Sequence, residues 1–223
     1  QINYNSRKAR IDFEFEKAEQ NREANKTADK LSLEFEGLAD DYILNSSTSF
    51  TTTAAATSAF NESITSKAKE KIAGLSLTDR QKSLIEAKVL NGLAPKLSNA
   101  KRNAYNYGTA ETTRVHNEKV VTQISAIQPD STPEELAALT EGLEQDARTV
   151  IANGGSPTLQ PHQIRASVFT AFTDTRIASS STLEDLDTLG EGIEKLQIST
   201  GAKNNLRARL NTRRTALAKE IND

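Results

Sequence analysis

Basic side chains recur near the C-terminal end of the sequence, where they could bind a phosphate group or an acidic partner subunit. Six of them against Glu220 leave segment 203–220 with a net charge of +5, whereas five acidic residues against Lys195 leave segment 184–195 at −4. We favour the interpretation that these are antiparallel neighbouring helices that pair through their opposite charges. The alternative is a basic strip that faces phosphate or an acidic partner, made of Lys203, Arg207, Arg209, Arg213 and Arg214.

Nucleic acid is a weaker candidate ligand for this strip. Surfaces that bind single strands usually add aromatic side chains on which bases stack, and segment 203–220 has none. We therefore expect at most transient, non-specific contact with DNA, and its affinity should fall steeply as salt rises.

No catalytic motif is recognisable in the sequence. It has no phosphate loop, no dinucleotide glycine fingerprint, no His-Glu-x-x-His and no Gly-x-Ser-x-Gly. The segment Phe60-Asn61-Glu62-Ser63 resembles the start of the lytic transglycosylase motif, in which the glutamate is a general acid, but the downstream glycine-rich stretch ending in Gln is missing. We interpret Glu62 as a solvated helix residue, His116 as a surface residue and His162 as a first-turn residue, and we expect no enzyme activity and no cofactor.

The composition predicts a helical chain with thin apolar seams. Of 223 residues, 36% are hydrophobic and 5% aromatic, and the net charge of −2 gives no field that would concentrate nucleic acid or anionic membrane. The absence of Cys, with only two His, argues against disulfides and zinc sites. No apolar run is long enough to span a bilayer, which predicts a soluble chain. Because it begins at Gln1 and lacks Met, we expect a processed product or a part of a longer chain.

Two helices are predicted in the first part of the chain. Residues 5–45 predict one long helix, and its apolar seam has steps of four and three residues, at Ala24, Ala28, Leu31, Phe35, Leu38 and Tyr42. The Ser/Thr/Ala-rich tract 46–58 predicts a turn and a weak helix start. A second helix should fold back on the first and end near Gly74, with Phe60, Ile64, Ala68 and Ile72 on its apolar face.

A third long helix should begin at the capping box Thr78–Gln81. Gly92 and Pro95 interrupt its pattern, and an interior proline costs about 3 kcal/mol, so we expect a kink or a fresh start there. The polar stretch 108–114 is a candidate hinge. We place the end of the first domain, residues 1–128, after this helix.

The second domain, residues 129–223, contains a repeated motif. STPEELAALTEGLE at 131–144 recurs at an offset of fifty as STLEDLDTLGEGIE at 181–194, with a threonine N-cap and an aligned interior glycine, Gly142 or Gly192, in each copy. Ile164-Arg165-Ala166 and Leu206-Arg207-Ala208 extend the match into the following helices. We therefore predict tandem helix-hairpin repeats at 131–180 and 181–223. The fold class is all-α, with elongated long-helix hairpins followed by these two repeats.

Three features together resemble the internal virion or DNA-ejection proteins of short-tailed bacteriophages. They are the charged stretch ARIDFEFEKAEQNREANKTADKLSLEFEGLADDYI, the proline-containing run LNGLAPKLSNAKRNAYNYG, and the hairpins opened by STPEEL and STLEDL around the spacer NGGSPTLQPHQIRASV. The resemblance implies a helical protein stored inside the virion and released into the host periplasm and cell envelope. There its copies would form a ring or tube that conducts the genome, with other ejection, portal or tail proteins as partners. Some members carry a transglycosylase domain, but this chain departs from that pattern.

Two other classes of protein stay open. One is a helical scaffold or binding module of a larger surface or secreted protein, without catalysis. The other is an enzyme fragment, for which no acid, base or metal constellation is present.

Overall fold

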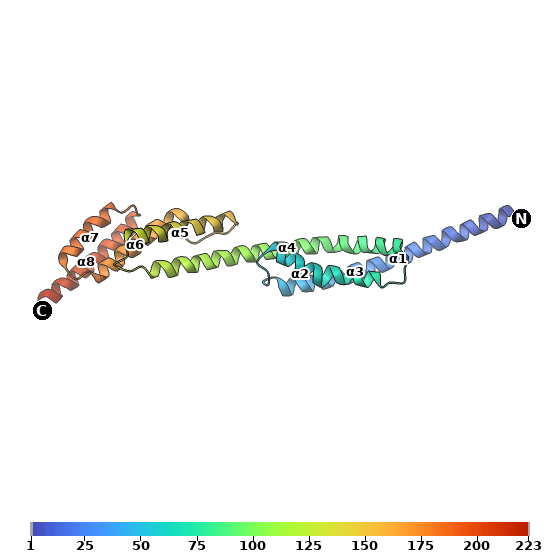
Figure 1. The fold of residues 1–223 in the computed structure, drawn as a ribbon, viewed down its shortest axis with the longest axis horizontal. Coiled ribbons are helices and arrows are strands. Elements are labelled where there is room, and N and C mark those ends of the chain that lie inside the picture. The colour runs from blue at the N-terminus through green and yellow to red at the C-terminus, as the bar shows by residue number, and fades with distance from the viewer. Residues whose placement is uncertain (1, 223) are drawn as a thin grey trace. The chain divides into compact units, whose positions relative to one another are not determined.

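The chain is all-α, as predicted. The computed structural model describes the backbone of residues 2–222 and the side chains of residues 7–221, and the described backbone contains helices and no strand. The chain divides into two compact units, residues 1–108 and 109–223 (Figure 1). The division lies at the predicted hinge 108–114 and ahead of the domain limit predicted at residue 128, and one helix continues through it.

Unit 1 is built from three helical layers. The first is α1 (Ile2–Ser46), and the second is α2 (Thr53–Phe60), η1 (Asn61–Thr65) and α3 (Ser66–Ala73), which continue one another. The third is the first part of α4 (Asp79–Ser125). All three layers contribute to one apolar cluster, which includes Phe35 of α1, Phe60 of α2, Ile72 of α3 and Val89 of α4. The predicted box at Thr78 is confirmed, since its amide donates to Gln81 Oε1 at 3.0 Å.

The predicted seam of α1 is correct at its start and wrong at Leu38. Ala24, Ala28, Leu31 and Phe35 are buried, but Leu38 is 45% exposed and Ala39 is fully buried instead. An α-helix has 3.6 residues per turn, so a strict pattern of four and three drifts off the buried face unless the helices supercoil. The seam of α1 therefore takes two consecutive steps of four.

No new helix starts near Gly92 and Pro95, which was one of the two outcomes that we expected there; the other, a kink, stays a prediction. Helix α4 runs without interruption from Asp79 to Ser125, with Pro95 inside it. A proline removes one backbone hydrogen bond of the helix, but Val89 and Leu93 before it and Ala100 after it are buried in the core of unit 1. This packing on both sides of the proline holds the helix together.

Gly108 ends unit 1 at a close approach of two backbones. A Cβ atom at this position would collide with the carbonyl group of Thr51, in the turn before α2. Any side chain at residue 108 would therefore force the turn away from α4.

Unit 2 contains the end of α4 and the two predicted hairpins. These are α5 (Pro133–Ala152) with α6 (Pro161–Ser179), and α7 (Leu183–Lys195) with α8 (Thr200–Asn222). One apolar cluster joins α4, α5 and α6, and a second joins α6, α7 and α8. Helix α6 therefore belongs to both bundles of three helices.

The repeat is visible in equivalent positions of the two hairpins. Leu136 and Leu186 are buried, as are Leu143 and Ile193. The amides of Glu135 and Asp185 donate to Thr132 and Thr182 Oγ1 at 3.2 and 3.1 Å, so both threonines cap their helices. The first repeat completes the capping box through a 2.8 Å bond from the Thr132 amide to Glu135 Oε2. The shorter Asp185 makes no such return bond among the described residues.

The aligned glycines of the repeat are not explained by packing within the chain. An added Cβ would meet nothing within 4 Å at Gly142 or at Gly192. Both positions would therefore accept alanine in the isolated chain.

Candidate functional site

Opposite charges of α7 and α8 face each other, which confirms the interpretation that we favoured. Arg207 donates through Nε and Nη2 to the two carboxylate oxygens of Glu194, at 2.7 and 2.5 Å. This bidentate contact holds the pKa of Glu194 below its usual value. Arg214 pairs with Asp187, seven residues or about two helical turns further along the same interface. Lys203 donates to the backbone oxygen of Glu194 at 2.7 Å, at the C-terminal end of α7.

The other two residues of the predicted strip face away from α7. Arg209 pairs with Asp174 of α6. Arg213 donates to the carbonyl oxygen of Ser180 at 3.0 and 3.2 Å and to Glu220 at 3.1 Å. The five predicted cations thus lie on one helix but point to two sides of it, and each already has an acceptor. A phosphate group would have to compete with these contacts, and such binding stays a prediction.

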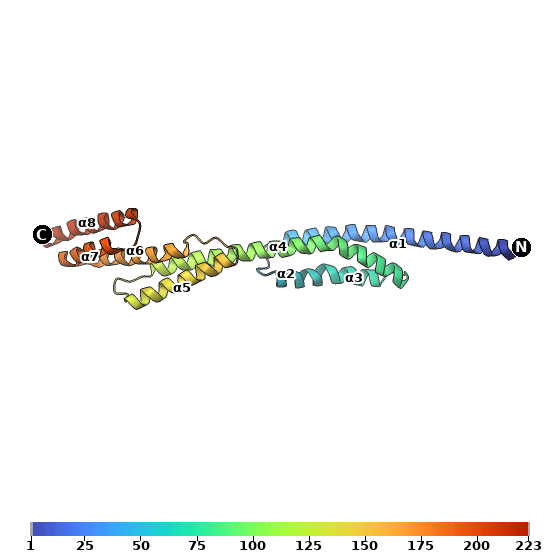
Figure 2. The same cartoon turned by 90° about the horizontal axis from the view of Figure 1, so that it is seen from above.

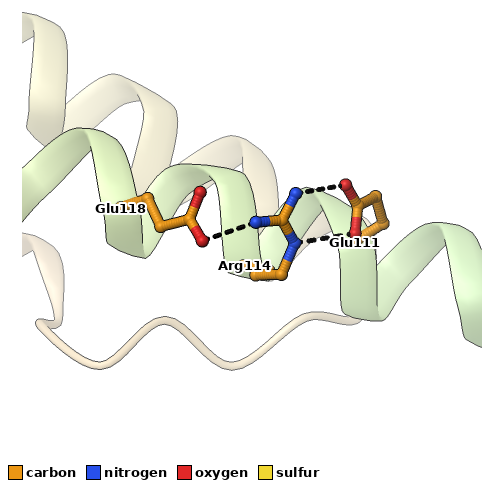
Figure 3. A network of polar contacts seen from close by, with 3 residues as sticks. All are labelled: Glu111, Arg114 and Glu118. Atoms are coloured by element: carbon orange, nitrogen blue, oxygen red, sulfur yellow. Dashed lines mark hydrogen bonds and ion pairs between the residues drawn. The ribbon is translucent and has the colours of Figure 1, made fainter.

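A second charged network lies on the surface of α4 in the predicted hinge. Arg114 donates to both oxygens of Glu111, at 2.7 and 2.9 Å, and to Glu118 at 2.5 Å (Figure 3). These contacts lower the pKa of Glu111 and raise the pKa of Arg114. Pairs spaced three and four residues apart stabilise a helix. They therefore stabilise the helical conformation of the polar stretch 108–114, where the sequence predicted a hinge.

His116 is buried, which corrects its interpretation as a surface residue. Its side chain is 4% exposed, and neither ring nitrogen has a hydrogen-bond partner among the described residues. Burial lowers the pKa of His116 below 6.5; the nearby Asp146 opposes this effect and Lys119 adds to it. The flanking polar residues suggested exposure, but the period of α4 puts His116 four residues before the buried Val120. That spacing is the signal that could have placed it in the core.

The remaining candidates lie where the sequence placed them. His162 is the second residue of α6 and is exposed, and Glu62 is an exposed helical residue. The sequence did not predict that Glu62 lies in the π-helical turn Asn61–Thr65, although π turns often occur at functional sites. Glu62 belongs to unit 1, whereas both histidines belong to unit 2.

Neither a metal-binding cluster nor a membrane-spanning helix occurs among the described residues. Residues 7–221 include no group of three or more His, Asp or Glu side chains arranged to hold a metal ion. None of the helices described is both long enough and apolar enough to cross a membrane. Comparison of the chain with protein-family models, curated proteins and solved structures gave no match.

Proposed function

We propose that the chain is a structural protein that works by assembling with copies of itself, as the ejection proteins of short-tailed bacteriophages do. In this proposal it is stored in the virion, passes into the host periplasm and forms a ring or tube that helps to conduct the genome across the cell envelope. Other ejection, portal or tail proteins are its partners, and catalysis has no part in its function. The proposal rests on the sequence resemblance and on one feature of α1.

That feature is the exposed N-terminal part of α1. Every described side chain from Arg7 to Glu23 is exposed, and Ile11, Phe13 and Phe15 are 65%, 65% and 69% exposed. The N-terminal end of α1 extends beyond the other helices of unit 1 (Figure 2), and within Arg7–Glu23 the Gln20 carbonyl accepts a hydrogen bond from Gln81 of α4 at 3.3 Å. A single helix of this length is only marginally stable in water, and burying an aromatic side chain contributes about 1.5–3 kcal/mol. Contact with other copies would provide that burial.

The charge of the chain is compatible with a conduit for DNA. With a net charge of −2 and the α8 cations engaged by carboxylates and carbonyl oxygens, the protein would hold passing phosphates weakly. A conduit needs no base-specific contact.

Sedimentation velocity and negative-stain imaging over a range of protein concentrations test the proposal. We expect rings or tubes, and we expect them to be lost when Ile11→Asp and Phe15→Asp are combined. Leu33→Asp is the matched control, because Leu33 is 73% exposed on the same helix but outside the segment Arg7–Glu23. A strictly monomeric species at the highest concentration would refute assembly and favour the scaffold or binding module instead.

A further inference from the structure

The two repeats differ most in the connection between their helices. Residues 153–160 join α5 to α6, whereas only residues 196–199 join α7 to α8. Next to the shorter connection, α6 and α8 border an open groove of about 740 Å³. Its lining includes Ala166, Ser167 and Thr170 of α6 and Ala202 and Asn205 of α8.

Because of the repeat, the surface of α6 in this groove corresponds to a surface of α4 in the first bundle. Ile127 and Ile177 are both buried, and each lies six residues before the first residue of the next helix, Pro133 or Leu183. The offset of fifty residues therefore extends backward from α5 and α7 into α4 and α6. It matches His116, Asn117 and Val120 of α4 with Ala166, Ser167 and Thr170 of α6.

In the first repeat the connection 153–160 lies against this part of α4. The amide of Thr158 donates to Asn117 Oδ1 at 2.9 Å, and Thr109 Oγ1 donates to the Asn153 carbonyl at 3.3 Å. Pro157 is buried, and Leu159 packs against the cluster that contains Val120. At Gly155 a Cβ atom would collide with the Thr113 hydroxyl, so the connection lies directly on α4.

In the second repeat the same positions are uncovered. His116 and Val120 are buried, but their counterparts Ala166 and Thr170 are only half-buried. Alanine in place of histidine also leaves free volume in the floor of the groove. The connection 196–199 is four residues shorter than 153–160, and it forms part of the groove lining through Gln197, Ile198 and Ser199.

We propose that the groove between α6 and α8 binds an extended, uncharged peptide of a partner protein, with a proline followed closely by a branched apolar residue. Residues 153–160, NGGSPTLQ, show the chemistry that covers the matching surface of the first repeat. Ser167 takes the place of Asn117 and can accept a hydrogen bond from a peptide amide. The charged pair in the lining, Asp174 and Arg209, neutralises itself. The occupant is a partner and not a second copy, because segment 153–160 of each copy is already held by its own α4.

Binding of the synthetic peptide ANGGSPTLQP, residues 152–161, to the full chain tests the proposal by NMR. We expect saturable shifts of the amide signals of Ser167, Thr170, Ala202 and Asn205, and no such shifts with a scrambled peptide. Ala202→Phe should abolish the shifts by filling the groove, whereas Ala208→Phe, at an exposed position of α8 outside the lining, should preserve them. Ser167→Leu fills the groove from α6 and gives the same expectation if Ala202→Phe does not fold.

Three results would overturn the proposal. They are shifts that do not saturate, equal shifts with the scrambled peptide, and shifts centred on His116 and Asn117, which would mean that the peptide displaces the chain's own connection instead.

Discussion

The first and second repeats of unit 2 share their N-caps and buried positions and differ in their other contacts. Both begin with a threonine cap, and both bury a pair of residues seven positions apart, Leu136 with Leu143 and Leu186 with Ile193. The connections, the charges and the grooves are different. The caps and the buried positions are therefore what the two hairpins have in common, and their other contacts differ.

The largest effect should come from the shared buried positions. Leu143→Ala and Ile193→Ala each remove side-chain atoms from a fully packed cluster, so each should lower the free energy of unfolding by about 2–5 kcal/mol. Urea unfolding measures both losses. A loss below about 1 kcal/mol at only one of the two positions would show that they are not equivalent.

A fall in pH should destabilise the first repeat through His116. The second repeat lacks this effect, because its matching residue is Ala166. The pKa of His116 lies below 6.5 in the folded chain, so the unfolded chain binds the proton more tightly. The stability that this difference contributes is present above pH 6.5 and is lost as the pH falls through the lower folded value. Urea midpoints on both sides of pH 6.5 should differ less in His116→Leu than in the natural chain. His162→Gln, at the exposed histidine, should keep the full difference; equal pH profiles for all three chains would refute this account.

The N-caps should show a smaller difference between the repeats. Thr132→Ala removes one side of a closed capping box and should cost about 1–2 kcal/mol. Thr182→Ala removes a cap without the return bond and should cost about 0.5–1 kcal/mol. Thermal unfolding of the two variants measures both losses of stability. A larger loss for Thr182→Ala than for Thr132→Ala would show that the return bond to Glu135 does not strengthen the first cap.

The aligned glycines should have the smallest effect and the opposite sign. Gly142→Ala and Gly192→Ala meet no neighbouring atom, so each should stabilise the chain by about 0.5–1 kcal/mol. Gly108→Ala is the contrasting variant and should destabilise unit 1, because its Cβ would collide with the Thr51 backbone. Destabilisation at Gly142 or Gly192 would reveal a contact that the single chain does not show.

The sequence predicted the elements better than their surroundings. Repeating apolar residues and caps are local signals, and they placed Phe60, Ile72 and the threonine N-caps of α5 and α7 correctly. The errors arose where distant residues decide the outcome. Packing on both sides carries α4 through Pro95 without a new helix start, Ala39 is buried in place of Leu38 where α1 packs against the other helices of unit 1, and His116 is buried near Asp146 of α5.

The sequence also predicted only those contacts of the charged site that depend on local charge. Local charge correctly indicated pairing between α7 and α8, as at Arg207 with Glu194. It could not show that Arg209 contacts Asp174 of α6, because that contact depends on how the third helix of the bundle is placed. Residue type identified the cations, and only the fold assigned their partners.

Amide hydrogen exchange tests most directly whether the backbones of the two connections are held differently. The amides of Gly155 and Thr158 donate to the Val150 carbonyl at 2.8 Å and to Asn117 Oδ1 at 2.9 Å, whereas those of Gln197 and Ile198 donate to no described residue. We predict slow exchange at Gly155 and Thr158 and fast exchange at Gln197 and Ile198. Equal exchange in the two connections would contradict the difference between the repeats on which the proposed groove depends.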